Sequence, residues 1–161
     1  MEVVISLGVA TGTLLAIMQL LMLAVGQSQE AASDSVGAQI STKLMGEIQL
    51  MPWDDVDAFA PGGNPDYRFF NEFGEELEAP LGQNDSVFTA LLRVSSPTND
   101  PVRLTSTGGA PANEYLRQAT VYVAAAPSTI GQSLITDYAA NGVRDSRLSV
   151  HNSMITHFEK D

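Results

Sequence analysis

The chain has 161 residues, no cysteine and a formal net charge of −11, from 19 acidic and 8 basic side chains. The absence of cysteine rules out disulfides and thiol-based metal or redox chemistry. The acidic charge has the wrong sign for following nucleic-acid phosphates or for docking on anionic lipid headgroups, so we expect no nucleic-acid partner.

An uncharged apolar stretch occupies residues 3–25, directly after Glu2. A helix of about 20 apolar residues is long enough to cross a bilayer, so this stretch predicts a membrane segment. A carboxylate at its edge is costly in lipid and requires a partner. Two alternatives stay open. A signal peptide cleaved after Gly26 would need a shorter apolar core and a basic start, and a plain single-span anchor leaves Glu2 unexplained.

Residues 27–52 keep the helical period but become amphipathic. The apolar positions recur every four residues, and the polar side chains lie mostly off this stripe. Pro52 marks the expected end of the helix. We therefore predict a transmembrane or filament-core helix over residues 1–26 that continues as an amphipathic helix over residues 27–52. The side chains expected to pack on a globular head are Val36, Ile40, Leu44 and Ile48.

The stretch from Trp53 to Asp66 contains two prolines, two adjacent glycines and four aspartates, which predicts a connecting loop. Carboxylates are the ligands that Ca²⁺ prefers, but their spacing does not match an EF-hand. We expect a solvated acidic loop and no cofactor, with calcium as a minor alternative. The aspartates concerned are Asp54, Asp55, Asp57 and Asp66.

Residues 53–161 are predicted to form the globular head, because the hydrophobic period falls to two from Tyr67 onward. Tyr67–Phe70 and Glu75–Glu78 flank a four-residue connection in which Gly74 suits a positive φ, so a hairpin is expected. Alternating patterns predict further strands at 87–94, 116–125, 134–138 and 148–158. Antiparallel strands with one solvent-exposed face fit these patterns. The predicted fold class is α+β: a long N-terminal helix packed on an antiparallel sheet.

The first ten residues, MEVVISLGVA, resemble the start of a type IV pilin or pseudopilin. In that family a short basic leader ends in Gly, and Phe-Thr-Leu, a hydrophobic residue, Glu and a long apolar helix follow. Glu2 takes the place of the family's glutamate. We expect the leader and the first mature residues to be encoded upstream of Met1. The segments YRFFNEFG (67–74) and ATVYV (119–123) further resemble the Verru_Chthon cassette protein B group of pilin-like proteins.

This resemblance implies a structural subunit of a type IV pilus or type II secretion filament. The subunit waits in the inner membrane with its head outside the cytoplasm and is then extracted into a periplasmic or extracellular filament. Its implied partners are copies of itself, other pilin-like subunits, and a separate assembly platform and motor. Glu2 is implied to set the register between subunits by pairing with a neighbour's terminal amine. The assembly residues are Glu2, Val3, Ile5, Leu7, Leu14, Leu15 and Leu20.

Catalytic patterns are weak, and we expect no enzyme activity. His151 and His157 lie six residues apart on a predicted strand, nominally about 20 Å, too far to share a metal. Gly131-Gln132-Ser133 lacks the closing glycine of a nucleophile elbow. Four glutamates around the hairpin predict a solvated edge: Glu72, Glu75, Glu76 and Glu78. The alternative function is a binding domain, secreted or membrane-anchored, whose apolar segment is a signal or an anchor.

Overall fold

The computed structural model describes residues 2–60, 65–78, 81–95 and 115–156. The chain divides into two compact units, Met1–Ser35 and Val36–Asp161, and each is described by itself. The division between Ser35 and Val36 falls within the predicted amphipathic segment, residues 27–52.

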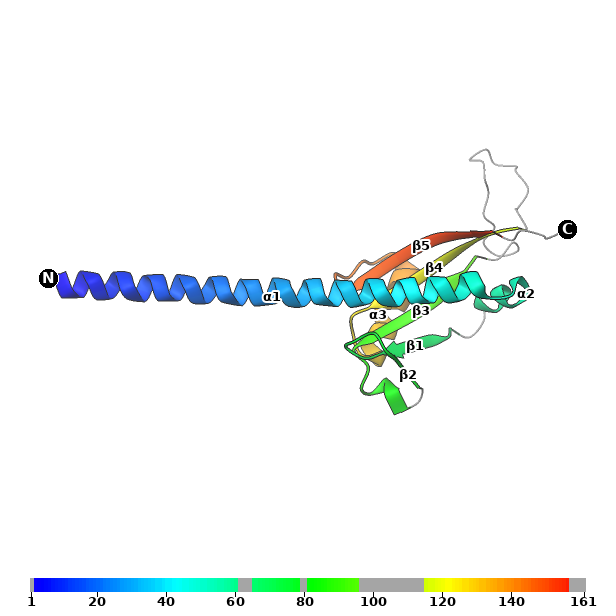
Figure 1. Ribbon diagram of the computed structural model, residues 1–161, viewed down its shortest axis with the longest axis horizontal. Helices are drawn as coiled ribbons and strands as arrows, with labels where there is room; N and C mark the ends of the chain where they lie inside the picture. Colours follow the sequence, from blue (N-terminus) through cyan, green and yellow to red (C-terminus); the bar gives the residue numbers. More distant parts are fainter. Residues whose placement is uncertain (1, 61–64, 79–80, 96–114, 157–161) are drawn as a thin grey trace, which may run out of the picture. The chain divides into compact units, whose positions relative to one another are not determined.

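Helix α1 runs from Glu2 to Leu50 (Figure 1). The apolar run, the helix-compatible residues that follow and the lack of proline before Pro52 allow one uninterrupted helix. Residues 2–35 form the N-terminal unit. From Val36 onward the helix belongs to the head and contributes one side of its core.

The head contains one antiparallel sheet in the order β2-β1-β3-β4-β5 (Figure 1). Its strands are β1 (Tyr67–Phe70), β2 (Glu76–Leu77), β3 (Phe88–Val94), β4 (Leu116–Ala124) and β5 (Leu148–Thr156). The predicted hairpin is confirmed: Phe69 pairs with Leu77, and Gly74 has a φ of 79°. Asn71 holds the turn, because its side-chain oxygen accepts hydrogen bonds from the backbone N–H groups of Phe73 and Glu75 at 2.9 and 3.0 Å.

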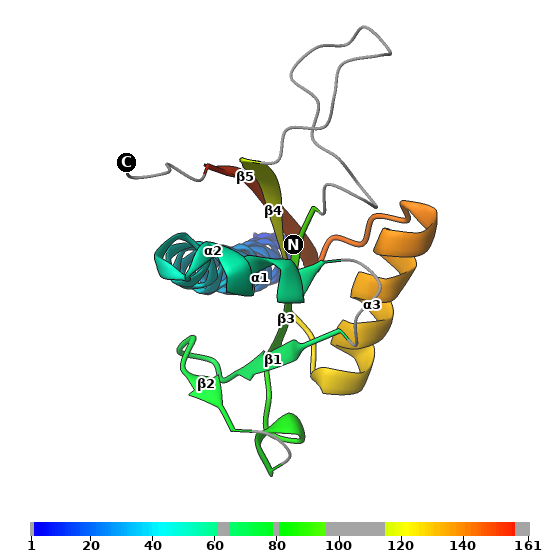
Figure 2. The same ribbon diagram turned by 90° about the vertical axis from the view of Figure 1, so that its right-hand side faces the viewer.

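Residues 36–50 of α1 cover one face of the sheet (Figure 2). Ile40, Leu44 and Ile48 are buried there, and each is at most 2% exposed. They join a single apolar cluster with alternate residues of the two central strands, which follows from the two-residue period of a strand. The strand residues are Phe88, Ala90, Leu92, Val94, Ala119, Val121 and Val123.

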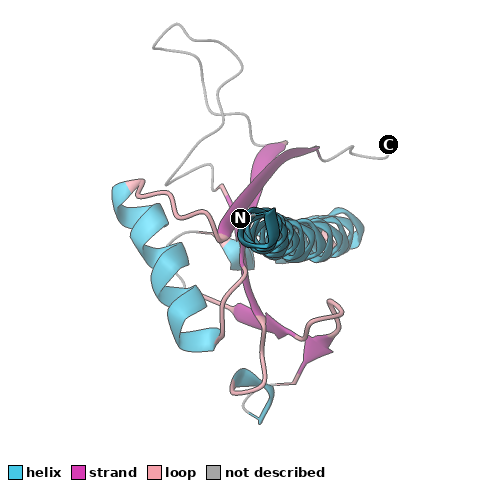
Figure 3. Cartoon of the chain, turned by 90° about the vertical axis from the view of Figure 1, so that its left-hand side faces the viewer, coloured by secondary structure: helices cyan, strands magenta, loops and turns pink. Residues whose placement is uncertain are grey.

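Helix α3 (Ser128–Asn141) covers the opposite face (Figure 3). The predicted strand at 134–138 is therefore wrong, because Ile135 packs from this helix into a second cluster with Leu91, Ala124 and Leu148. The prediction of one solvent-exposed sheet face is also wrong over this area. Pro127 and Gly142 bound the helix, and Gly142 adopts the left-handed conformation that ends many helices.

Gly131 allows α3 to approach the sheet closely. A Cβ built at this position would lie 2.5 Å from both Cβ and Oγ1 of Thr89, well inside contact distance. The Thr89 hydroxyl is fully buried and donates a hydrogen bond to the carbonyl of Ala126 at 3.1 Å. Glycine, which has no Cβ, is therefore required where the helix crosses β3.

Two short helices occupy much of the predicted 53–66 loop. They are α2 (Trp53–Val56) and a 3-10 helix, η1 (Asp57–Phe59); another 3-10 helix, η2, covers Leu81–Gln83. Val56 is buried in the α1-side cluster. This stretch is thus more ordered than the predicted loop, because Val56 and Phe59 pack against the core.

Candidate functional site

The first candidate surface is the apolar part of α1 within the N-terminal unit. Its large side chains between Leu14 and Val25 are 54 to 76% exposed in the monomer. Residues 12–50 contain a window that is apolar and long enough to cross a membrane, judged by length and composition, a test that signal sequences also pass. The helix is thus consistent with a membrane anchor or a signal sequence. In either setting this surface needs an apolar environment.

The predicted assembly residues all lie on α1, and three of them have described side chains. Leu14, Leu15 and Leu20 are 61, 59 and 65% exposed, which leaves them available to lipid or to another helix. The side chains of Glu2, Val3, Ile5 and Leu7 lie outside the described part of the structure, although their backbone is helical.

The second candidate surface is the stripe that joins α1 to the head. Ile40, Leu44 and Ile48 are buried against the sheet, while Val36 is half-buried at the margin of the same cluster. Val36 and Ile40 also face the hairpin, since Cγ1 atoms of both lie within 3.6 Å of a Cβ built on Gly74. The stripe therefore contacts both the sheet and the turn that follows β1.

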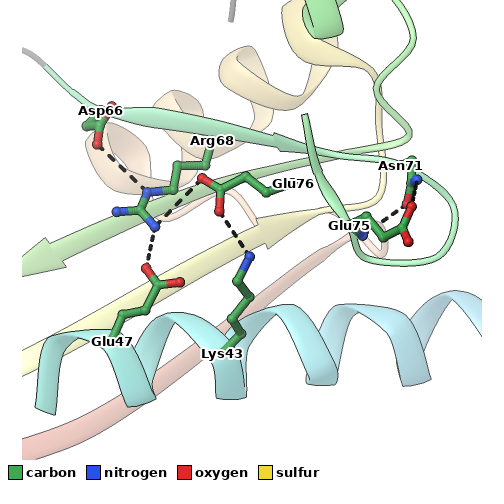
Figure 4. Close-up of polar contacts among 7 residues, drawn as sticks. All are labelled: Lys43, Glu47, Asp66, Arg68, Asn71, Glu75 and Glu76. Carbon is green, nitrogen blue, oxygen red and sulfur yellow. Dashed lines mark hydrogen bonds and ion pairs between the residues drawn. The ribbon is translucent and has the colours of Figure 1, made fainter. Parts of the chain in front are cut away.

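An ion-pair cluster fixes the β1–β2 hairpin against α1 (Figure 4). The Lys43 ammonium lies 3.0 Å from a carboxylate oxygen of Glu76, and Arg68 donates a short hydrogen bond to Glu47. The Arg68 guanidinium also lies 3.8 Å from carboxylate oxygens of Glu76 and Asp66. These side chains are partly exposed, so each pair contributes at most about 1 kcal/mol and acts mainly to set orientation.

The ion-pair cluster changes the prediction that the glutamates of the hairpin are simply solvated, because two of them have side-chain partners. Glu76 is engaged by both Lys43 and Arg68, and Glu75 accepts a hydrogen bond from the Asn71 amide at 2.8 Å. Sequence reasoning missed these pairs because Lys43 and Glu76 are far apart in the chain. Arg68 and Phe69 are neighbours in a strand, so their side chains lie on opposite faces of the sheet, and Arg68 lies on the α1 side. This alternation is the sequence signal that could have indicated an ion pair between Arg68 and α1.

The aspartates considered for calcium lie around α2 and the start of β1. Asp54 and Asp55 are exposed on α2, and Asp66 points to Arg68. Among residues 2–60, 65–78, 81–95 and 115–156, no group of three or more His, Asp or Glu side chains is placed to hold a metal ion.

The residues considered for catalysis do not come together. Gly131, Gln132 and Ser133 lie within α3, where Gly131 serves helix packing. His151 lies in β5, and His157 falls outside the described residues.

A pocket of about 290 Å³ lies where the end of α1 and α2 meet the end of β5. It is lined by Ile48, Gln49, Met51, Trp53, Val56, Met154, Ile155 and Thr156, and polar atoms contribute more of its surface than apolar atoms do. The guanidinium carbon of Arg117 lies 5.0 Å from the centre of the Trp53 ring, and Arg117 is itself buried. Sequence reasoning missed this pocket because it is assembled from segments about 100 residues apart.

Comparisons with known proteins identify no relative: no protein-family model, no curated protein and no solved structure matches the chain. The resemblance to type IV pilins therefore rests on the residues of the sequence.

Proposed function

We propose that this protein is a structural pilin-like subunit, namely a pilin, minor pilin or pseudopilin of a type IV pilus or type II secretion filament. The observation that carries the proposal is the change in surroundings along α1. Leu14, Leu15 and Leu20 are exposed in the N-terminal unit, whereas Ile40, Leu44 and Ile48 are buried in the head. A helix divided in this way suits a subunit that presents one apolar half to other molecules and keeps the other half for its own core.

The exposed half has to stay out of water before and after assembly. Leaving one large aliphatic side chain in water costs about 1.5–3 kcal/mol relative to burying it, and the segment between Leu14 and Val25 exposes several of them. In a membrane these side chains contact lipid. In a filament they contact the same segment of neighbouring subunits, so transfer from membrane to filament keeps them out of water.

Glu2 gives the association its register in this proposal. An unpaired carboxylate drawn to the centre of a bilayer costs roughly 2.5–3.5 kcal/mol on insertion scales, and at the edge of the apolar stretch, where Glu2 lies, it costs less. Pairing with a terminal amine on a neighbouring subunit removes that cost and favours one axial position among the many that apolar contacts alone allow. This role comes from the resemblance of the first ten residues to pilins.

A second candidate function is a soluble exported domain. The observation that favours it is that residues 36–161 form a compact unit with two apolar clusters. Cleavage after Gly26 would leave Ile40, Leu44 and Ile48 in place, so the head would keep its core without the apolar segment.

The test of the proposal is Glu2→Ala, made in the native precursor and expressed in the native host. The matched control is Glu30→Ala, which removes an exposed carboxylate from the same helix outside the apolar stretch. We expect equal amounts of both variants in the membrane, but at least a tenfold loss of Glu2→Ala from the sheared filament fraction. Equal filament yields for the two variants would contradict the role of Glu2. A wild-type chain found wholly in the soluble exported fraction would favour the second candidate.

A further inference from the structure

Strand β5 forms one edge of the sheet, and no strand within the described part of the chain pairs with its outer side. All nine residues of β5 pair in continuous register with β4, so the strand has no bulge. Its sequence, LSVHNSMIT, contains no proline, lysine or acidic residue. Those are the features that proteins use to protect an edge strand from pairing. The strand therefore offers a long and regular edge for another backbone.

The hydrogen-bonding pattern shows which main-chain groups this edge presents. Directly opposed residues of an antiparallel pair alternate between hydrogen-bonded and non-hydrogen-bonded pairs. The Ala125 N–H donates to the Arg147 carbonyl at 2.8 Å, next to the first β4–β5 pair. The pairs that exchange hydrogen bonds are then those of residues 149, 151, 153 and 155. The N–H and C=O groups of Val150, Asn152 and Met154 consequently point to the open edge.

The 290 Å³ pocket lies beside the same strand, at its C-terminal end. Ile155 turns its side chain to the α1 side, where the pocket is lined by Ile48, Met51 and Trp53. In an added strand, the residue opposite Ile155 would also point to this side, because paired residues share a face of the sheet. Its two neighbours would exchange main-chain hydrogen bonds with Met154 and Thr156.

We propose that β5 and this pocket bind an extended segment of a different protein by β-strand addition. The main chain of the segment pairs with Val150, Asn152 and Met154, and one large side chain, opposite Ile155, enters the pocket. In this mode of recognition the backbone supplies affinity and the side-chain pocket supplies selectivity. The inference is independent of the proposed role of α1 in a filament.

Charge identifies the chemistry of the partner more closely. A second copy of β5 contains no lysine or arginine, so it offers no positive charge to the acidic side chains beside the pocket. The one-turn helix that contributes Trp53 and Val56 to the pocket also exposes Asp54 and Asp55. The segment that fits is therefore uncharged where it pairs with β5 and carries lysine or arginine at the end that lies beside α2.

The first part of the test measures whether the edge is open. Amide hydrogen exchange is followed by NMR on the full chain in nanodiscs of neutral lipid. We expect fast exchange at Val150, Asn152 and Met154 and slow exchange at His151, Ser153 and Ile155. Slow exchange at all six amides would mean that the chain covers its own edge, and it would overturn the proposal.

The second part measures binding through Trp53, the sole tryptophan of the chain and a lining residue of the pocket. The probes are blocked nine-residue peptides of alternating threonine and valine that begin with lysine and carry Phe, Leu, Met or Trp at the second position. When the second residue lies opposite Ile155, the nine residues lie opposite Thr156 to Leu148 in an antiparallel pair. For the first three peptides, Trp53 emission reports binding; for the tryptophan peptide, calorimetry does. We expect saturable binding of at least one peptide, and at least tenfold weaker binding when its second residue is alanine or its edge-facing amides are N-methylated.

Two protein variants separate the edge from general effects. Asn152→Pro removes an N–H that points outward and breaks no β4–β5 hydrogen bond, whereas Asn152→Thr keeps that N–H. The Asn152 side chain does not line the pocket, so neither substitution changes it. We expect at least tenfold weaker binding by Asn152→Pro than by Asn152→Thr. The proposal fails if no peptide binds saturably, or if N-methylated peptides bind as well as their parents. It also fails if Asn152→Cys forms disulfide-linked dimers efficiently, because the occupant would then be a second copy.

Discussion

The burial of Leu44 leads to a quantitative prediction for the stability of the head. Leu44 is fully buried between α1 and the sheet, at 0% exposure. Leu→Ala substitutions in well-packed cores cost about 2–5 kcal/mol, because transfer energy is lost and a cavity remains. Leu44 belongs to the largest apolar cluster of the head, so we expect Leu44→Ala to cost about 3 kcal/mol of unfolding free energy. With a shift of several degrees per kcal/mol, its Tm should fall by roughly 10 °C.

The matched control is Leu14→Ala, the same substitution on the same helix at a position that is 61% exposed. We expect it to change the stability of the head by less than about 0.5 kcal/mol, as exposed substitutions commonly do. The assay is thermal unfolding of the full chain in detergent micelles, followed by Trp53 fluorescence and near-ultraviolet circular dichroism. Equal Tm values for the two variants, or a larger loss for Leu14→Ala, would refute the assignment of the core to residues 36–50 of α1.

Two further predictions concern α3 and the start of β5. Gly131→Ala should destabilise the head by about 1–3 kcal/mol, because the new methyl group would lie 2.5 Å from Thr89. Gly46→Ala, where a Cβ meets nothing within 4 Å, should be neutral or stabilising by up to about 1 kcal/mol when both variants are unfolded in urea. The reverse order of stability would refute the close helix–sheet crossing. The side chain and backbone of Arg147 donate hydrogen bonds that lower the pKa of Asp145 from 3.8 to about 2. Its contribution to stability is thus present above pH 4 and lost as the pH falls through 2. NMR titration of the carboxyl carbon should give this midpoint, and a value near 3.8 in the wild type would contradict the ion pair.

Local periodicity predicted the long helix and most of the sheet. The four-residue spacing of Ile40, Leu44 and Ile48 indicated a helix face that needs cover, and the alternation from Phe88 to Val94 indicated a strand with a buried face. Both patterns follow directly from the order of polar and apolar side chains, and both elements occur in the structure. The hairpin was equally accessible, since Asn71 and Gly74 supply its turn chemistry.

The errors share a cause: strand periodicity does not show that a helix covers the second face of the sheet. The predicted strand at 134–138 contains Leu134 and Tyr138, whose four-residue spacing also fits one face of a helix. Pro127 before the segment and Gly142 after it are the stop signals that a helix interpretation would have used. The burial of Leu91 and Thr89 under α3 is a tertiary property that strand alternation alone does not reveal.

Some of the candidate sites could also be predicted from the sequence, and others could not. Exposed apolar residues of α1 can be proposed from composition, because no charge interrupts the stretch. Composition does not predict the contact between Lys43 and Glu76 or the pocket around Trp53. Each depends on how elements that are distant in the chain are aligned with one another. The open edge of β5 likewise depends on strand order, which periodicity does not determine.

The most direct test of the proposed function is mass spectrometry of the N-terminal peptide from native material. The account predicts a trimmed, methylated terminus a few residues before Glu2, as expected for a processed pilin-like subunit. A terminus at Gln27 would contradict it, because the apolar segment would then be removed and the protein would be a soluble exported domain.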